Sequence, residues 1–503
     1  MSELKLKTAR TLKWNTIDRV ATQVLYAVVG IVLANILTHE EFGLVGALAI
    51  FQAFATIFVD SGFGAALLRE AKEPSDRDYS TVFWFNVAVS LAIYLILFIC
   101  APVIARLFDN QRELIPMSKV MFLTFVINGL AIVQTNRLMK RMDVRMIAVS
   151  NSVALIVSGV VGVVLALAGA GAWAMVWYAV SQAAVKTAIL WATGGWWPRL
   201  CFSFATIRRI HRVGMSVFLS ALLNTISLNI YNFVIGVWYS VASLGVYTQA
   251  DKWSKMGSAS ISQILTSTFV PLLSKFQKSL QDFHRYVDRA GRFTAFILLP
   301  SMTLLAILAA PIFHLLFGDK WDAAIPLFSM LALRGIFVVL ISLYSNYLLS
   351  LGRAKKLFLS EAVKDGLILF AIVLTVGYGD IDLLVLGQTA ASVITWLILL
   401  PVTARGIGMR PLRLLWHLFP FLAATIFAAL AAIGAGNLLL YGLGHPDMSV
   451  EIAPRIGWNL MLIITQTAAF AAVYIIVLRC LRVTELPESA GYLFGRFRRR
   501  RNS

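Results

Sequence analysis

The sequence has few charged residues and few cysteines. Charged residues make up 14% of the 503 positions and hydrophobic residues 59%, whereas soluble domains carry about 25% charged residues. With apolar stretches of about 20 residues, this composition excludes an ordinary soluble domain and indicates a polytopic membrane protein. The three cysteines, Cys100, Cys201 and Cys480, have no spacing typical of a disulfide framework or a metal site.

Signatures of catalysis are also missing. The chain has no G-x-x-x-x-G-K-[ST] phosphate-binding loop, so ATP hydrolysis by this chain is not expected. Its six histidines are scattered without metal-ligand spacing. We therefore expect neither a catalytic residue nor a metal or organic cofactor, and we interpret the protein as something other than an enzyme.

Acidic residues are scarce relative to basic ones, with 25 against 44 and a net charge of +19. In a soluble chain such an excess would indicate nucleic-acid binding. Here the basic residues cluster between apolar segments, so we expect no nucleic acid. The arginine run "GRFRRRR" near the C-terminus is typical of a segment that meets anionic membrane lipids.

Windows of about 20 apolar residues predict fourteen transmembrane helices. The first, Trp14 to Leu37, is too long for a signal-peptide core and lacks a cleavage site. The predicted helices cover residues 13–38, 42–69, 79–107, 114–138, 145–168, 172–195, 213–239, 243–273, 291–317, 322–350, 356–377, 382–404, 415–441 and 456–480.

The distribution of basic residues supports this count. With a cytoplasmic N-terminus, the segments on the cytoplasmic side hold 33 basic residues and those on the other side hold four. The four are Arg106, Arg112, Lys320 and Arg455. Cytoplasmic loops carry the excess of Lys and Arg, so the pattern predicts both termini in the cytoplasm.

The chain also repeats itself. "CAPVIARLFDNQRELIP" at 100–116 returns as "AAPIFHLLFGDKWDAAIP" at 309–326, and "LTHEEFGLVG" at 37–46 returns as "YSVASLGVYT" at 239–248. Since six helices separate the copies, both enter the membrane from the same side, and the substrate is expected between the halves near the midplane. The predicted parts are an N-terminal lobe (1–195), a cytoplasmic linker (196–212), a C-terminal lobe (213–404), two further helices (405–482) and a basic cytoplasmic tail (483–503).

Three stretches resemble a known family: "LANILTHEEFGLVGALAIFQAFATIFVDSGFGAALLRE", "STVFWFNVAVSLAIYLILFICAPVIARLF" and "GVYTQADKWSKM". They are similar to the polysaccharide transporter branch of the MOP exporter superfamily, which includes Wzx-type oligosaccharide flippases. The resemblance covers about residues 12–400. It implies an all-α, MOP/MATE-like fold with fourteen helices in two lobes, a central cavity and a lipid-diphosphate-linked oligosaccharide as cargo. One departure is Tyr231, where the family often has an acidic residue.

Charged residues within the predicted helices are the candidates for substrate binding. "YTQADKWSKM" places Asp251, Lys252 and Lys255 on one face of a predicted helix, and Arg334 lies at similar depth in another. Ionised side chains near the bilayer centre cost at least about 2.5–3.5 kcal/mol. We expect Lys252, Lys255, Arg334 and Arg19 to bind a diphosphate, while Asp18, Asp60 and Asp251 are candidates for proton or sodium coupling.

Polar residues at helical spacing are candidates for lining the cavity. They are Asn15, Thr22, Tyr26, Asn224, Ser227, Tyr231, Glu361 and Lys364. Such stripes equally suit interhelical hydrogen bonds, and a structural ion network of Asp251 and Lys252 with Glu361, Lys364 and Asp365 is a second interpretation of the charges. In the first repeat the matching positions are uncharged, which favours binding of a ligand.

Together these features predict a flippase of the bacterial inner membrane. Its cargo would be an undecaprenyl-diphosphate-linked unit of O-antigen, capsule or exopolysaccharide, moved by alternating access, and polysaccharide assembly proteins are candidate partners. Two alternatives stay open: a MATE-like antiporter of small molecules or ions, and a membrane polysaccharide polymerase or ligase. A lysine-rich cavity disfavours cationic cargo, and short predicted loops disfavour a polymerase.

Overall fold

The structure is a computed structural model that describes residues 2–60, 63–69, 74–277, 279–443, 452–481 and 483. Every regular element within these ranges is helical. The chain divides into two compact units, residues 1–248 and 249–503, and the division falls inside helix α10 (Val241–Lys275). The lobe boundaries inferred from the repeat differ from this division and stay a prediction.

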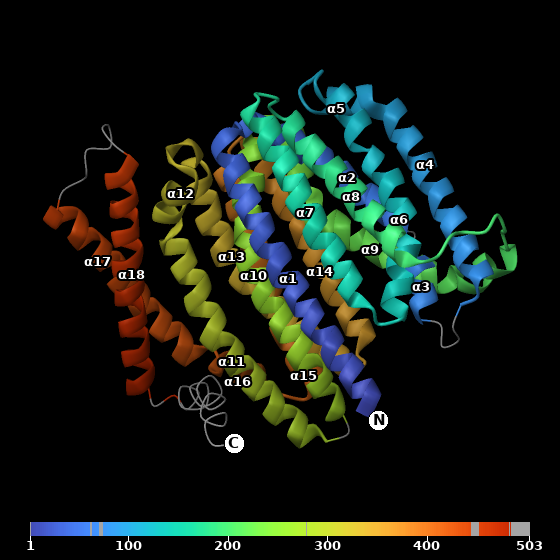
Figure 1. The fold of residues 1–503 in the computed structure, drawn as a ribbon. Helices are drawn as coiled ribbons and strands as arrows, with labels where there is room; N and C mark the ends of the chain where they lie inside the picture. The colour runs from blue at the N-terminus through green and yellow to red at the C-terminus, as the bar shows by residue number, and fades with distance from the viewer. Residues whose placement is uncertain are drawn as a thin grey trace. The chain divides into compact units, whose positions relative to one another are not determined.

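The first unit contains nine complete helices within the described residues and the start of α10 (Figure 1). Helix α7 packs against α1 and α8, α6 packs against α4 and α8, and α2 packs against α9. The helices are α1 (Ser2–Ile36), α2 (His39–Asp60), α3 (Phe63–Arg69), α4 (Asp76–Leu107), α5 (Leu114–Met121), α6 (Leu123–Lys140), α7 (Val144–Leu167), α8 (Trp173–Gly194) and α9 (Phe204–Trp238).

The second unit holds the rest of α10 and the helices that follow. Helix α15 packs against α13 and α14, α11 packs against α13 and α17, and α17 pairs with α18 (Figure 1). The elements are α11 (Leu280–Ile307), α12 (Ala309–Phe317), η1 (Asp319–Trp321), α13 (Ala324–Ser350), α14 (Ala354–Thr375), η2 (Val376–Tyr378), α15 (Ile381–Ile407), α16 (Pro411–Trp416), α17 (Phe419–Leu443) and α18 (Ile452–Cys480).

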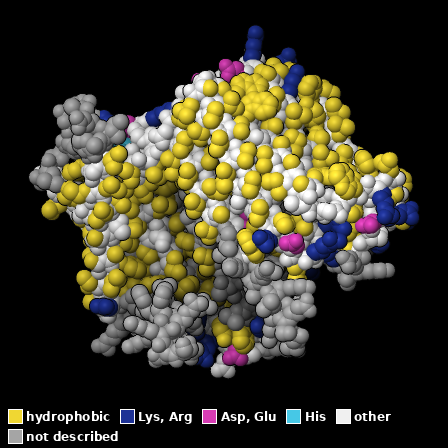
Figure 2. Space-filling view, viewed as in Figure 1, with side chains coloured by type: hydrophobic (Ala, Val, Ile, Leu, Met, Phe, Trp, Pro, Cys, Tyr) yellow, Lys and Arg dark blue, Asp and Glu magenta, His cyan; other side chains and the backbone are white. Residues whose placement is uncertain are grey.

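The outer surfaces of these helices are apolar. Residues such as Ile99 and Val160 are 75% and 60% exposed, and hydrophobic side chains cover most of the helix flanks in view (Figure 2). In water such a surface would cost free energy, whereas in a bilayer it contacts acyl chains. The chain is thus a multi-pass membrane protein, as predicted.

Eleven helical stretches in the described residues are long and apolar enough to cross a membrane. Helices α8, α10 and α14 are not among these eleven, and each carries at least one lysine. These three correspond to the predicted helices 172–195, 243–273 and 356–377. The count of fourteen spans therefore stays a prediction.

Several helix ends differ from those expected, and the largest differences are early starts: α1 begins at Ser2 instead of 13. Helix α9 begins at Phe204 instead of 213, and α11 begins at Leu280 instead of 291. Serine caps explain both starts, because the hydroxyls of Ser203 and Ser279 accept hydrogen bonds from the backbone N–H three residues ahead. Hydropathy misses these turns because their side chains are polar.

The repeat is visible as an equivalent contact inside each unit. Phe108, which matches Phe317 in the repeat, packs its ring edge-on against Phe51 with centroids 6.2 Å apart. Phe317 packs against Trp253 at 5.4 Å, and Trp253 lies 202 positions after Phe51, the offset of the second repeated stretch. Both phenylalanines are buried, so the duplicated stretches make the same packing contact.

Candidate functional site

An ion pair lies within the predicted charged face of α10. The Lys255 Nζ is 2.6 Å from Asp251 Oδ2, and the two residues are four apart on the helix. The Asp251 side chain is 9% exposed and that of Lys255 is 43% exposed. A buried carboxylate therefore holds an ammonium group that remains accessible. The ion pair lowers the free-energy cost of placing either charged side chain in an apolar helix.

Lys252 has aromatic surroundings. Its ammonium lies 5.4 Å from the ring centroid of Trp253, a distance at which a cation is attracted by the ring face. The Trp253 indole N–H donates to Gln249 Oε1 at 3.1 Å, and its ring packs on Phe317. The neighbour of Lys252 is therefore fixed in place by two contacts.

Arg334 on α13 is oriented from α15, where its Nε donates to Ser392 Oγ at 3.1 Å. Helix α13 lies close to α10 beside this residue: a Cβ added at Gly335 would be only 3.1 Å from the Ser258 Cβ. Ser258 is one turn beyond Lys255. Lys255 and Arg334 therefore lie at a similar level on two helices in contact.

A second group of charges lies on α14. Lys364 contacts Glu361 and lies 3.7 Å from Asp365, so one lysine bridges two carboxylates of its own helix. The group on α14 carries one surplus negative charge, whereas Asp251, Lys252, Lys255 and Arg334 together carry a surplus of two positive charges. The positive surplus on α10 and α13 gives this part of the second unit the capacity to attract an anion.

In the first unit, Asp18 is the centre of a polar group on α1. It accepts hydrogen bonds from Thr22 Oγ1 at 3.4 Å and from the Asn151 amide on α7 at 3.3 Å. The ammonium of Lys186 on α8 attracts the same carboxylate electrostatically. Three helices of the first unit thus meet through one acid.

The remaining predicted residues of α1 and α9 differ in burial. Arg19 and Tyr26 are exposed on α1, and Asn224 is exposed on α9. Ser227 is half-buried and bonds the Leu223 carbonyl of its own helix. Tyr231 is 2% exposed, so it belongs to the packed interior of the first unit.

Two predicted residues lie outside what the structure describes. The side chains of Asn15 and Asp60 are among the undescribed ones. The arginine-rich segment at 495–501 also falls outside the described residues.

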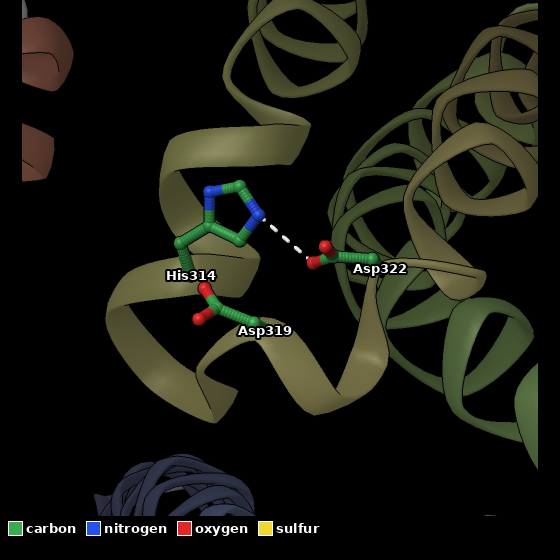
Figure 3. Close-up of side chains that lie close together, drawn as sticks. All are labelled: His314, Asp319 and Asp322. Carbon is green, nitrogen blue, oxygen red and sulfur yellow. Dashed lines mark hydrogen bonds and ion pairs between the residues drawn. The ribbon is translucent and has the colours of Figure 1, made fainter. Parts of the chain in front are cut away.

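A cluster of metal-ligand type lies at the end of α12 (Figure 3). His314, Asp319 and Asp322 offer ligand atoms that all lie within 4.8 Å of one another. His314 Nε2 is 2.9 Å from Asp322 Oδ1, and Asp319 is 2.8 Å from Arg455 Nη1 on α18. Since Arg455 already supplies a positive charge and both aspartates are exposed, the group is explained as a polar link between α12, η1 and α18.

Sequence reasoning missed the partners of Asp18. Asn151 and Lys186 lie on helices far from α1 in the sequence, and no spacing rule relates them. The pairing of Asp251 with Lys255 could be predicted from their i, i+4 spacing, which places both side chains on one face of a helix. The second interpretation had instead paired Asp251 with Lys252.

Residues 32–326, more than half of the chain, match the family described as "Polysaccharide biosynthesis protein". Among curated relatives, the succinoglycan biosynthesis transport protein ExoT of Rhizobium meliloti (strain 1021) is 26% identical over 373 residues, covering 74% of each chain. The teichuronic acid biosynthesis protein TuaB of Bacillus subtilis (strain 168) is 27% identical over 377 residues, covering 72% of this chain and 76% of TuaB.

Solved structures show the same fold. The lipid II flippase MurJ in an inward closed conformation superposes with a TM-score of 0.72 at 13% identity, covering 93% of this chain and 99% of MurJ. An inward-facing multidrug resistance MATE transporter of the MOP superfamily gives a TM-score of 0.57 at 18% identity, covering 76% of this chain and 95% of the transporter. The prediction of an all-α, MOP/MATE-like fold is confirmed.

Proposed function

The chain belongs to the polysaccharide biosynthesis protein family, and from this premise we propose that it is a flippase for a lipid-diphosphate-linked oligosaccharide. The names of its relatives support a role in polysaccharide synthesis, and the name of ExoT supports transport. The MurJ-like fold supports movement of a lipid-linked substrate by alternating access. These similarities also favour a transporter over an enzyme such as a polymerase or ligase.

The observation that carries the proposal is the surplus of positive charge on α10 and α13. A diphosphate taken out of water requires cationic partners, and charge-assisted hydrogen bonds are the strongest that a protein offers it. We assign Lys255, held by Asp251 at 2.6 Å, and Arg334, held by Ser392 at 3.1 Å, as the diphosphate-binding groups. Lys252, three residues before Lys255 on α10, contributes a third cation.

Polar groups of the first unit are assigned to the sugar part of the cargo. Thr22, Tyr26, Asn224 and Ser227 carry hydroxyl and amide groups along α1 and α9. Sugar hydroxyls require such donors and acceptors when water is removed. Arg19 is exposed on α1 and supplies a further cation.

Energetic coupling is assigned to carboxylates. Asp18 is bonded to Thr22 and Asn151 and attracted by Lys186, so a change in its proton or sodium occupancy would alter the contact of three helices. Asp251 would play the corresponding role in the second unit by releasing Lys255. Asp60 stays a candidate from its sequence position alone.

A MATE-like antiporter is the second candidate, favoured by the TM-score of 0.57 to such a transporter. The charges around Lys255 and Arg334 count against it for cationic cargo, because a positive surplus repels cations. The proposed location is the bacterial inner membrane with both termini cytoplasmic, which is supported by the bias of 33 to four basic residues.

Deletion of the gene in its source bacterium tests the proposal. We expect a glycan-diphosphate-lipid to accumulate in extracted membranes, and a plasmid copy of the wild-type gene to clear it. Unchanged lipid-linked glycans, together with a changed resistance to small cationic compounds, would favour the antiporter instead.

A further inference from the structure

A pocket of about 640 Å³ lies on the second unit, apart from the charges of α10 and α13. Its polar lining comes from Asp288 and Arg292 on α11 and from Arg410 and Arg413 at the start of α16. The lining contains three guanidinium groups and one carboxylate, so it has a surplus of two positive charges. The volume falls within the range of sites that bind small molecules, about 300–1,000 Å³.

The carboxylate fixes the geometry of this pocket. Asp288 pairs with Arg413 and also lies 3.2 Å from His417 Nε2. These two contacts hold α16 and the residue that follows it against α11. Arg292 and Arg410 provide the remaining positive charge of the lining.

The rim of the pocket is apolar. Leu412 and Trp416 belong to its lining and are 70% and 67% exposed. The Trp416 ring stacks on Phe419, with centroids 5.4 Å apart and planes 6° apart, and Phe419 is itself 56% exposed. Exposed tryptophan beside arginine is typical of the boundary between lipid acyl chains and headgroups.

We propose that this pocket binds the phosphodiester headgroup of an anionic phospholipid. Guanidinium groups match phosphate oxygens in charge and in planar geometry, and basic pockets between transmembrane helices on the cytoplasmic side suit anionic headgroups. Arg292, Arg410 and Arg413 all belong to the basic set that predicts the cytoplasmic side. The apolar rim can contact the acyl chains of a lipid. A free phosphate ion has no apolar part to contact it, so the rim favours a phospholipid.

Arg410→Gln provides the test, because Arg410 is exposed, lines the pocket and precedes the first residue of α16. Arg405→Gln is the matched control: it removes the same charge from an exposed position five residues earlier that does not line the pocket. Binding of phosphatidylglycerol and phosphatidylcholine to the full chain in detergent is measured by native mass spectrometry.

We expect Arg410→Gln to weaken phosphatidylglycerol binding about fivefold, since one basic residue near a membrane surface contributes about 1 kcal/mol. Arg405→Gln should leave it unchanged, and phosphatidylcholine should bind less than phosphatidylglycerol to the wild type. Equal loss in both variants would overturn the proposal in favour of general surface attraction. Displacement of the lipid by millimolar glycerol phosphate or inorganic phosphate would overturn it in favour of a free-anion site.

Discussion

Lys255 is paired with a buried carboxylate and yet remains accessible, so it can have both a structural role and a ligand-binding role. As a partner of Asp251 it compensates a buried carboxylate, and as an accessible ammonium group it is available to an anion. The two roles respond differently to substitution, so both can be measured in one set of variants.

We expect Lys255→Met to lower stability and to abolish export. Loss of the ammonium leaves Asp251 without its partner, which costs about 1–3 kcal/mol because the pair is intermediate between buried and exposed ones. Thermal unfolding of the purified protein measures the first effect, and cell-surface polysaccharide measures the second. Lys255→Arg retains the charge and should keep substantial export.

The double variant Asp251→Asn with Lys255→Met separates the roles. It removes both charges, so we expect thermal stability close to that of the wild type, while export stays lost because the Lys255 ammonium assigned to the diphosphate is absent. Recovery of export together with stability would show that the pair is a scaffold and would remove Lys255 from the proposed site.

Ser392 tests the orientation of Arg334 without removing a charge. Ser392→Ala deletes the hydroxyl that accepts from Arg334 Nε, and such a charge-assisted contact contributes about 1.5–3 kcal/mol. We expect membrane abundance to stay normal and export to fall about tenfold or more. Thr389→Ala is the control, since the Thr389 hydroxyl bonds only a carbonyl of its own helix among the contacts described; an equal loss there would contradict the assignment.

At the residue scale, sequence could predict the types and depths of the charged groups but not all of their partners. Asp251 and Lys255 meet because a helix brings i and i+4 together. Asp18 meets Asn151 and Lys186 only after α1, α7 and α8 have packed. Sequence spacing cannot predict these contacts, because the three residues lie far apart in the chain.

At the scale of elements, the close approach of α2 to the start of α10 depends on two glycines. A Cβ added at Gly43 would lie 1.8 Å from the Val241 carbonyl oxygen, and one added at Gly245 would lie 1.9 Å from the His39 carbonyl oxygen. The two glycines are 202 positions apart, the offset of the repeat that contains them. Equivalent glycines of the two repeats, one on α2 and one on α10, therefore allow the two helices to approach closely.

We expect Gly43→Ala and Gly245→Ala to destabilise the protein by about 1–3 kcal/mol each, because the obstructing atoms belong to the backbone and overpacking moves whole helices. Fluorescence-detected gel filtration after heating measures the change. Gly366→Ala on α14 is the control, since no atom lies within 4 Å of its added Cβ. Similar melting for all three variants would show that the contact carries no stability.

Hydropathy predicted where the helices lie but not where they break. Each of the fourteen predicted segments contains a helix, but 114–138 is broken at Phe122 and 291–317 at Leu308. The residues at both breaks are apolar, so a hydropathy window cannot detect them. Pro311 lies in the second copy just after such a break, whereas its counterpart Pro102 lies inside a continuous helix, which shows that proline alone did not determine the breaks.

At the scale of the whole molecule, the charge bias predicts which loops face the cytoplasm. In a chain whose three cysteines have been replaced, single cysteines at Glu40 and Arg112 should react with an impermeant reagent added to intact spheroplasts. Cysteines at Arg208 and Arg353 should react only after lysis. All four positions are exposed, so failure to react would not reflect burial; labelling of Arg208 before lysis would contradict the fourteen-helix topology.

The central claim, movement of a lipid-diphosphate-linked oligosaccharide, is tested most directly in vesicles. The lipid that accumulates in the deletion strain is incorporated with purified protein, and its accessibility to an impermeant glycan-modifying enzyme is followed over time. The account predicts that wild-type protein makes nearly all of the lipid accessible, while empty vesicles and the double variant at Asp251 and Lys255 leave the inner-leaflet fraction protected. Equal protection in vesicles with wild-type protein and in empty ones would contradict it.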